Sequence, residues 1–238
     1  MSIERLMVIG AHAGDFVWRA GGAIAVTTAN GGTASVIALS YGERGESGEL
    51  WKEEGQTTER VKEIRHGEAE RAANALDAQF DCLDLGDYPL QIDYDALMRI
   101  TDRIREFAPE VLITHTDTDP FNPDHPVAYE ATAKARALAA GAGVPSAFAT
   151  VRPPVLYLFE PHQPELCNFT PNTFLDITAV FDKKLAAMEE MQAQRYLQTY
   201  YAQRADQRGN HARRSSGNQA IRQAEAFQRV TPNVVSAL

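Results

Sequence analysis

The sequence predicts an α/β protein with a Rossmann-like, three-layer fold, in which a mostly parallel sheet is covered by helices on both faces. Short apolar runs of the buried-strand type alternate along the chain with longer amphipathic stretches. The connections between them are short, which favours right-handed strand-helix-strand units and a parallel sheet. A chain of 238 residues, 44% of them hydrophobic and 23% charged, is long enough to bury the core of one such domain.

The first half of the chain repeats the order strand, loop, helix. Strands are predicted at the short apolar runs 6–10 (LMVIG), 33–40 (TASVIALS) and 79–85 (QFDCLDL). Helices are predicted where apolar residues recur at helical spacing, at 16–30, 57–76 and 95–107. Gly31 and Gly32 end the first helix, and a glycine-rich charged loop, YGERGESGELWKEEGQ, follows the second strand. The loops after the strands are therefore expected to gather along one edge of the sheet.

The second half continues this pattern and then becomes less regular. Strands are predicted at 110–114 (EVLIT), 155–160 (VLYLFE) and 174–178 (FLDIT), and helices at 126–140 and 183–203. From Ala205 onward the chain is polar, with basic patches and the segment RGNHARRSSGN at its centre. We therefore divide the chain into a main domain, 1–204, and a C-terminal extension, 205–238, packed on the same domain or on a neighbouring subunit.

The overall charge and the cysteine content restrict the classes of partner and compartment. A net charge of -9 argues against nucleic acid as a partner, because there is no general positive field to displace counterions. The two cysteines, Cys82 and Cys167, lie far apart and do not form a disulfide framework or a thiolate zinc motif. We find no signal-peptide pattern and no stretch of membrane-spanning length, so we expect a cytoplasmic protein that does not enter the membrane.

The turn after the first predicted strand carries a histidine and a carboxylate. His12 and Asp15 lie in the stretch IGAHAGDFVW, at the carboxyl end of a strand, where open α/β sheets form a crevice. An imidazole and a carboxylate three residues apart can converge on one divalent cation. The alternative is that Asp15 caps the following helix and that His12 is an incidental loop residue.

A second polar loop, HTDTDPFNPDHPVAYE, follows the fourth predicted strand. His125 precedes Pro126 at the start of a helix, so we expect it at the same sheet edge as His12 and Asp15. Two nitrogens and one oxygen form the open tetrahedral site of a catalytic zinc ion, although such a set also accepts iron or cobalt. Asp124 is in a suitable position to orient a ligand. The alternative is an ordinary polar loop before a helix.

Together these segments resemble the PIG-L/LmbE-like family of zinc-dependent N-acetylglucosaminyl deacetylases. The resemblance includes the first-strand motif AHAGD, the GERG segment, the Arg65 and Glu68 pair, and the NPDH loop. It implies His12, Asp15 and His125 as the metal ligands. Two positions depart from the family pattern, because Gly14 replaces the aspartate that acts as general base and Asn122 replaces a histidine. A glycine cannot accept a proton, so the deacetylase mechanism lacks its base.

These departures resemble one branch of the family, the 4-oxalomesaconate hydratases of gallate and protocatechuate degradation. AHAGDFVWRAGGAIA, SYGERGESGELW, DLGDYPL, DPFNPDHP and FEPHQPE carry the resemblance, over roughly the first 165 residues. It implies addition of water to a conjugated double bond, with Glu46 activating the water and His162 as the general acid. The alternatives are that Glu46 is a solvated charge in an acidic loop and that His162 is a structural loop histidine between prolines.

A polycarboxylate substrate requires cationic side chains to bind its carboxylates. The candidate substrate-binding residues are the arginines Arg44, Arg65, Arg19 and Arg213, together with Asn122. Arg19 and Arg65 have the alternative of pairing with an acid along their own helix, and Arg213 that of a solvated tail. We expect a small polycarboxylate as the only partner besides further copies of the chain in a homo-oligomer. Two other functions stay open, a deacetylase of N-acetylated amino sugars and a catalytically inactive metal-binding module.

Overall fold

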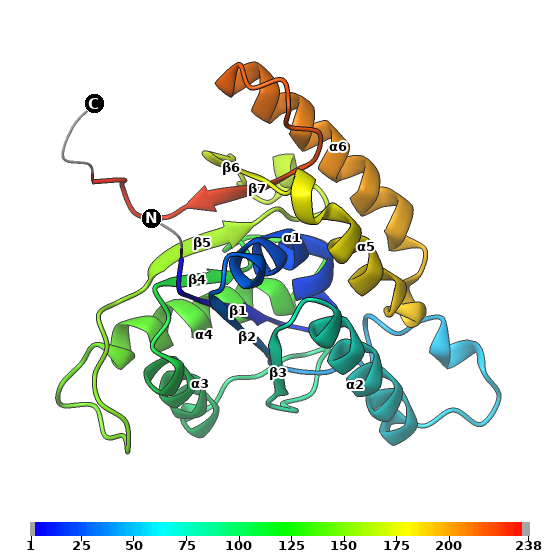
Figure 1. The fold of residues 1–238 in the computed structure, drawn as a ribbon. Helices are drawn as coiled ribbons and strands as arrows, with labels where there is room; N and C mark the ends of the chain where they lie inside the picture. Colours follow the sequence, from blue (N-terminus) through cyan, green and yellow to red (C-terminus); the bar gives the residue numbers. More distant parts are fainter. Residues whose placement is uncertain (1–2, 235–238) are drawn as a thin grey trace.

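The computed structural model describes residues 3–234, and Figure 1 shows one twisted sheet with helices on both of its faces. Within the described residues the sheet has seven strands, in the order β3-β2-β1-β4-β5-β7-β6. Their bounds are β1 Arg5–Gly10, β2 Thr33–Ala38, β3 Gln79–Cys82, β4 Val111–Thr114, β5 Val155–Phe159, β6 Thr173–Asp176 and β7 Ala224–Arg229. The predicted fold class, a Rossmann-like three-layer α/β fold with a mostly parallel sheet, is confirmed.

The strands β1 to β5 are parallel, and β1 lies at the centre of this part of the sheet. It pairs with β2 on one side and with β4 on the other, so that Val8 lies opposite both Val36 and Ile113. The order of the strands therefore reverses beside β1, and the loops that leave β1 and β4 diverge. In open α/β sheets the crevice for a ligand forms at such a point, outside the carboxyl ends of the strands.

Each face of the sheet buries its own hydrophobic core. The helices are α1 Asp15–Ala29, α2 Thr58–Ala75, α3 Tyr94–Phe107, α4 Asp124–Ala139, α5 Phe181–Glu189 and α6 Leu197–Ser216. Along β1, Leu6 and Val8 face the core that α1, α2 and α5 cover, whereas Met7 and Ile9 face the core under α3 and α4 (Figure 1). Because both faces are covered, β1 is apolar on both sides and does not show the alternation of a half-exposed strand.

A buried ion pair fixes α1 against the C-terminal part of the chain. The carboxylate of Glu225, in β7, accepts hydrogen bonds from the backbone of Gly22 (2.7 Å) and Ala23 (2.8 Å). The same carboxylate accepts a hydrogen bond from Lys184 Nζ at 2.6 Å, and Lys184 also donates to the carbonyl of Trp18 at 3.0 Å. Full pairing is what makes a buried carboxylate and ammonium tolerable. These contacts fix the helix that carries Asp15 and Arg19.

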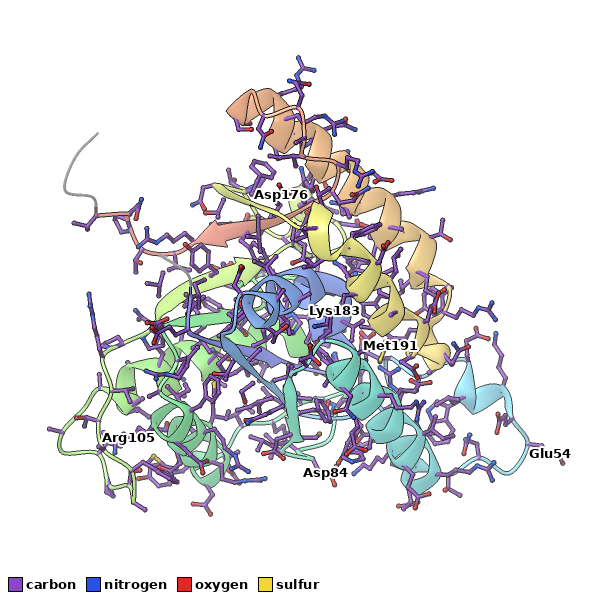
Figure 2. The ribbon with its side chains drawn as sticks, in the orientation of Figure 1. Glu54, Asp84, Arg105, Asp176, Lys183 and Met191 are labelled. Carbon is purple, nitrogen blue, oxygen red and sulfur yellow. The ribbon has the colours of Figure 1, made fainter. Side chains whose placement is uncertain are left out.

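The prediction of one helix at 183–203 is wrong. The chain forms α5 and α6, joined by a short 3-10 turn, Gln192–Gln194. Met191, labelled in Figure 2, is buried beside this turn and belongs to the core that α2 and α5 share. The Glu68 carboxylate of α2 accepts a hydrogen bond from the backbone of Ala193 at 2.8 Å. This tertiary contact replaces helical bonding, and local sequence does not encode it.

The residues after Ala205, to which the sequence assigns no element, include regular structure. The division between 204 and 205 falls inside α6, which continues to Ser216 and ends at Gly217 with a left-handed φ of 74°. The chain then forms β7, which lies between β5 and β6 and is antiparallel to both. Among the described residues, none of the helices is both long and apolar enough to cross a membrane.

Candidate metal centre and its surroundings

The structure brings His12, Asp15 and His125 together at the carboxyl edge of the sheet. His12 follows β1, Asp15 is the first residue of α1 and His125 is the second residue of α4. All three residues are buried, and one ligand atom of each lies within 4.8 Å of the other two. Two loops, more than 100 residues apart in the sequence, therefore place a nitrogen, an oxygen and a second nitrogen around one point.

The free ring nitrogens of both histidines face the Asp15 carboxylate. His12 Nδ1 lies 3.6 Å from Asp15 Oδ2, and His125 Nε2 lies 3.8 Å from Asp15 Oδ1. Within residues 3–234, neither nitrogen has a hydrogen-bond partner, although both are buried. The other ring nitrogens contact carboxylates, at 3.2 Å for His12 Nε2 and Asp124 and at 2.7 Å for His125 Nδ1 and Asp119. This is the arrangement of metal-binding histidines, whose outer nitrogen is oriented by a carboxylate.

The electrostatics of the cluster favour a cation. Burial, with the neighbouring His115 and Arg19, holds the pKa of His125 well below its usual range, so its ring is neutral and its lone pair is free. The pKa of Asp15 is held well below its usual range by His115 and His12, although burial opposes this shift. Burial also disfavours a charged His12, but hydrogen bonds that the ring donates to Asp124 and Asp15, with the charge of Glu46, outweigh it and raise its pKa to about 10. The neutral nitrogen of His125, the ionised carboxylate of Asp15 and the negative surroundings that favour a positive charge at His12 fit a divalent metal ion.

The carboxylate of Glu46 lies beside this cluster. Its Oε1 accepts a hydrogen bond from Asn122 Nδ2 at 2.7 Å and lies 3.8 Å from His12 Nδ1. Its Oε2 accepts a hydrogen bond from Gln194 Nε2 at 2.6 Å. Glu46 is thus held in place by two amides at the edge of the candidate metal centre, where a carboxylate can accept a proton from a water molecule.

His162 lies on the other side of Arg19. Arg19 Nη2 is 3.2 Å from His162 Nδ1, and Arg19 Nε is 3.8 Å from Asp15 Oδ1, so one guanidinium contacts both sites. A guanidinium only donates hydrogen bonds, so Nδ1 accepts and the neutral ring carries its proton on Nε2. Burial and the charge of Arg19 lower the pKa of His162 to about 4. Tyr200 stacks on the ring, with centroids 5.3 Å apart, and donates to the His162 carbonyl at 2.5 Å.

The predicted substrate-binding residues differ in their burial and in their hydrogen-bond partners. Arg19 is buried beside the metal cluster, with its guanidinium over the Phe159 ring. Arg44 is exposed, and its Nη1 donates to the carbonyl of Asp87 at 2.7 Å. Asn122 donates to Glu46, and its Oδ1 accepts from the backbone of Asp124 at 3.1 Å.

Arg65 and Arg213 have other partners than a substrate. The Arg65 side chain is fully buried, pairs with Glu68 at 2.8 Å and donates to Gln194 Oε1 at 2.8 Å. Arg213 lies near the end of α6, where it donates to Asn210 and to the carbonyl of Ile221. Arg65 therefore pairs with an acid of its own helix, which is the alternative that the sequence left open. Arg213 stabilises the connection between α6 and β7.

Sequence reasoning missed three residues around the site. Asp119 lies in the same polar loop as His125, and its spacing to that histidine was an available signal. Gln194 and Tyr201 come from the turn after α5 and from α6, and Tyr201 Oη lies 3.4 Å from His162 Nδ1. Neither position has a sequence signal, because only the fold brings this part of the chain to the sheet edge. His115 also lies at the site, with Nε2 3.0 Å from Asp15 Oδ2.

The chain is similar to known proteins over nearly its whole length. A 4-oxalmesaconate hydratase from Pseudomonas putida is 45% identical over 235 residues, which are 98% of this chain and 91% of that protein. The crystal structure of GalB, the 4-carboxy-2-hydroxymuconate hydratase from Pseudomonas putida KT2440, superimposes with a TM-score of 0.96 at 44% identity, and the match covers 99% of both chains.

More distant structures share the fold. The N,N'-diacetylchitobiose deacetylase from Pyrococcus horikoshii matches with a TM-score of 0.78 at 18% identity, over 95% of this chain and 83% of that one. Residues 7–136, which contain most of β1 and all of α1, the Glu46 loop and the His125 loop, match the model of the PIG-L family, described as GlcNAc-PI de-N-acetylase. From this match and the full-length similarity to the hydratase, the chain belongs to the PIG-L family.

Proposed function

We propose that this protein is a metal-dependent hydratase that adds water to 4-oxalomesaconate, a tautomer of 4-carboxy-2-hydroxymuconate, and forms 4-carboxy-4-hydroxy-2-oxoadipate. The observation that carries the reaction class is the Glu46 carboxylate beside the His12, Asp15 and His125 cluster, with a glycine at position 14. The full-length similarity to a hydratase supports the substrate.

His12, Asp15 and His125 would hold the metal ion. We propose zinc, with iron or cobalt as substitutes, because two nitrogens and one carboxylate discriminate poorly among divalent metals. When bound, such an ion lowers the pKa of a coordinated water toward about 7 and so supplies a nucleophile at neutral pH. Asp124 and Asp119 orient the two imidazoles through their outer nitrogens.

Glu46 and His162 act on different parts of the reaction. Glu46 accepts a proton from the attacking water, whose oxygen forms a bond to one carbon of the conjugated double bond. His162, neutral and with its proton on Nε2, donates a hydrogen bond toward the substrate on the opposite side of Arg19 and stabilises the enolate that forms. The second alkene carbon takes up a proton from solvent, and Glu46 returns to solvent the proton that it accepted, so that H and OH are added in total and no other reactant is consumed.

Two arginines are available for the substrate carboxylates. Arg19 lies between Asp15 and His162, and its Nε has no hydrogen-bond partner among the residues that the structure describes. Arg44, exposed on the GERG loop, retains donors beyond the one that contacts the Asp87 carbonyl. A guanidinium binds a carboxylate through two parallel hydrogen bonds, which suits a substrate with several carboxylates.

The experiment is a direct comparison of substrates with the purified, metal-loaded protein. We expect the ultraviolet absorption of 4-oxalomesaconate to fall with turnover, and no release of acetate from N-acetylglucosamine derivatives. Acetate release without loss of the conjugated absorption would identify a deacetylase, and neither activity in a fully metal-loaded protein would identify an inactive metal-binding module. The homo-oligomer stays a separate prediction, which light scattering of the same sample tests.

A further inference from the structure

The side chain of Gln194 has a fixed orientation. Its Oε1 accepts hydrogen bonds from Arg65 Nη2 at 2.8 Å and from Trp18 Nε1 at 3.2 Å. Guanidinium and indole nitrogens only donate, so the amide oxygen has to face them and the amide NH2 has to face the other way. In that direction lies Glu46 Oε2, at 2.6 Å from Gln194 Nε2. Gln194 is 2% exposed, and the orientation of its amide is therefore set by protein contacts.

The same arrangement occurs on the other oxygen of Glu46. Asn122 uses its Oδ1 to accept from the backbone of Asp124, which directs its NH2 toward Glu46 Oε1 at 2.7 Å. Each carboxylate oxygen is therefore held by one oriented amide donor. A catalytic group whose supporting contacts lock its geometry reacts faster, and a displacement of about 1 Å can cost on the order of 10²-fold in rate.

The position of Gln194 depends on Gly14. A Cβ atom at residue 14 would lie 2.5 Å from Gln194 Oε1, 3.0 Å from Arg65 Nη2 and 3.1 Å from Trp18 Nε1. These are the acceptor and the two donors of the hydrogen bonds that orient the Gln194 amide. Gly14 has a φ of -93° and a ψ of -18°, which any residue adopts, so the backbone conformation does not require a glycine. The glycine is required by the space that Gln194 occupies.

We propose that Gln194 is the positioning residue for Glu46, and that Gly14 and Gln194 form a complementary pair in which the missing side chain of one admits the amide of the other. A side chain at position 14 and the amide at position 194 exclude each other in this fold. This inference rests on the proposed role of Glu46. It identifies the turn after α5, which lies far in sequence from the loops that carry the metal ligands, as a support for Glu46.

The first test removes the donor and keeps the shape. In Gln194→Glu the oxygen that faces Arg65 and Trp18 is retained, but a carboxyl oxygen replaces the amide donor that faces Glu46. Two carboxyl groups at this distance share one proton, so Glu46 is no longer a free base. We expect kcat for hydration to fall on the order of 10²-fold with KM changed less than about threefold, at unchanged metal content. Gln192→Ala, on the exposed side of the same turn, is the matched control and should retain the rate of the unmodified protein. A Gln194→Glu protein with the unmodified rate would overturn the proposal.

Two double-variant comparisons separate positioning from simple packing. If Gln194 acts through Glu46, then Gln194→Glu should cause less than a threefold further loss of kcat in a Glu46→Gln background. If positions 14 and 194 compete for one space, Gly14→Ala should lower kcat strongly in the unmodified chain but cause less than about a threefold further loss in a Gln194→Ala background. If the losses of kcat in the single variants multiply in both double variants, Gln194 does not act through Glu46 and does not compete with position 14. A crystal structure of Gly14→Ala with Gln194 in its original place would also overturn the proposal.

The activities of Glu46→Gln and Gln194→Glu separate the role of Gln194 from that of Glu46. If Glu46→Gln hydrates at the unmodified rate, the role of Glu46 itself is wrong. If Glu46→Gln is inactive while Gln194→Glu is fully active, only the positioning role is wrong. Thermal unfolding of each metal-loaded variant serves as the second readout. If Gln194→Glu does not fold, the comparison is made from the Gly14→Ala cycle.

Discussion

Arg19 Nη2 lies 3.2 Å from His162 Nδ1, while Arg19 Nε lies 3.8 Å from Asp15 Oδ1. One buried guanidinium thus connects the candidate metal centre to His162, the proposed hydrogen-bond donor to the substrate. Because the guanidinium has no lone pair to offer, it determines which nitrogen of His162 carries the proton. The same contact keeps the ring neutral at physiological pH, since a second positive charge beside Arg19 is disfavoured.

The low pKa of His162 predicts a pH-dependent contribution to stability. In the folded protein the pKa is about 4, lowered by burial and by Arg19 from an ordinary value of 6.5. Between these two values the unfolded chain binds a proton that the folded chain does not, so the free energy of unfolding falls as the pH falls. This loss amounts to about 3 kcal/mol at most across the window.

Replacing His162 with glutamine removes this contribution. We expect urea unfolding of the metal-free proteins to show the unmodified chain losing stability relative to His162→Gln as the pH falls from 6.5 to 4. Metal-free samples are compared so that loss of the ion at low pH does not enter the difference. A stability difference between the two proteins that stays constant over this range would show that His162 is not held neutral.

The metal ligands predict a selective loss of the ion. His125→Ala removes one of three protein ligands, and three ligands leave no redundancy, so the protein should purify with less than about a tenth of the metal of the unmodified chain. His66→Ala, an exposed histidine on α2, is the matched control and should retain its metal. Elemental analysis by mass spectrometry checks both. Full metal content and full turnover in His125→Ala would exclude this residue as a ligand.

The sequence predicts the site better in the first half of the chain than in the second. The β1 and β4 loops carry their own signals, because His12, Asp15 and His125 stand in polar turns after apolar strands. The fold class followed from the same alternation. The support for Glu46 carried no such signal, since Gln194 lies in a turn that only the packing of α5 against α2 creates. An amide also looks the same in sequence whether it is solvated or buried.

The C-terminal part shows the same limit at the level of the fold. A polar composition after Ala205 favoured an extension without regular structure, but α6 is stabilised by ion pairs that a periodicity reading does not detect. Arg204 and Arg208 both pair with the buried Glu160 that follows β5. The alternation in AEAFQR is too short to identify β7, whose place in the sheet comes from pairing with β5 and β6.

The Glu225 contacts predict that Gly22 cannot be replaced. A Cβ at position 22 would lie 2.6 Å from Ile177 Cγ2 and 2.8 Å from the Glu225 carboxyl carbon. Gly22→Ala should therefore separate Glu225 from α1 and destabilise the protein by roughly 2 kcal/mol or more. Gly67→Ala is the matched control inside another helix, where the nearest atom is the flexible end of Arg71 at 3.2 Å. It should leave stability unchanged or raise it by up to about 1 kcal/mol.

Urea unfolding at pH 7 with bound metal measures both glycine variants. Equal stabilities for Gly22→Ala and Gly67→Ala would mean that the close approach of Glu225 to α1 is not needed. A loss of stability in Gly22→Ala with full activity at low temperature would place the effect in the fold and not in the site.

Gly14→Asp tests whether the missing carboxylate alone separates this protein from a deacetylase. The new side chain meets Gln194 Oε1, so we expect Gln194 to be displaced, Glu46 to lose one of its two amide donors and hydration to weaken. The added negative charge also lies where a polyanionic substrate binds. We expect no hydrolysis of N-acetylglucosamine derivatives. A variant that hydrolyses an N-acetyl sugar and still hydrates oxalomesaconate at the original rate would contradict this account.

The most direct test of the account is the fate of the water itself, because loss of ultraviolet absorption also accompanies simple tautomerisation. Metal-loaded protein is incubated with 4-oxalomesaconate in water enriched in oxygen-18, and the product is analysed by mass spectrometry. The account predicts a product that is heavier by one water molecule and carries one labelled oxygen in its new hydroxyl group. It also predicts that Glu46→Gln makes little of this product under the same conditions. A product of unchanged mass would contradict hydration, whatever happens to the absorption.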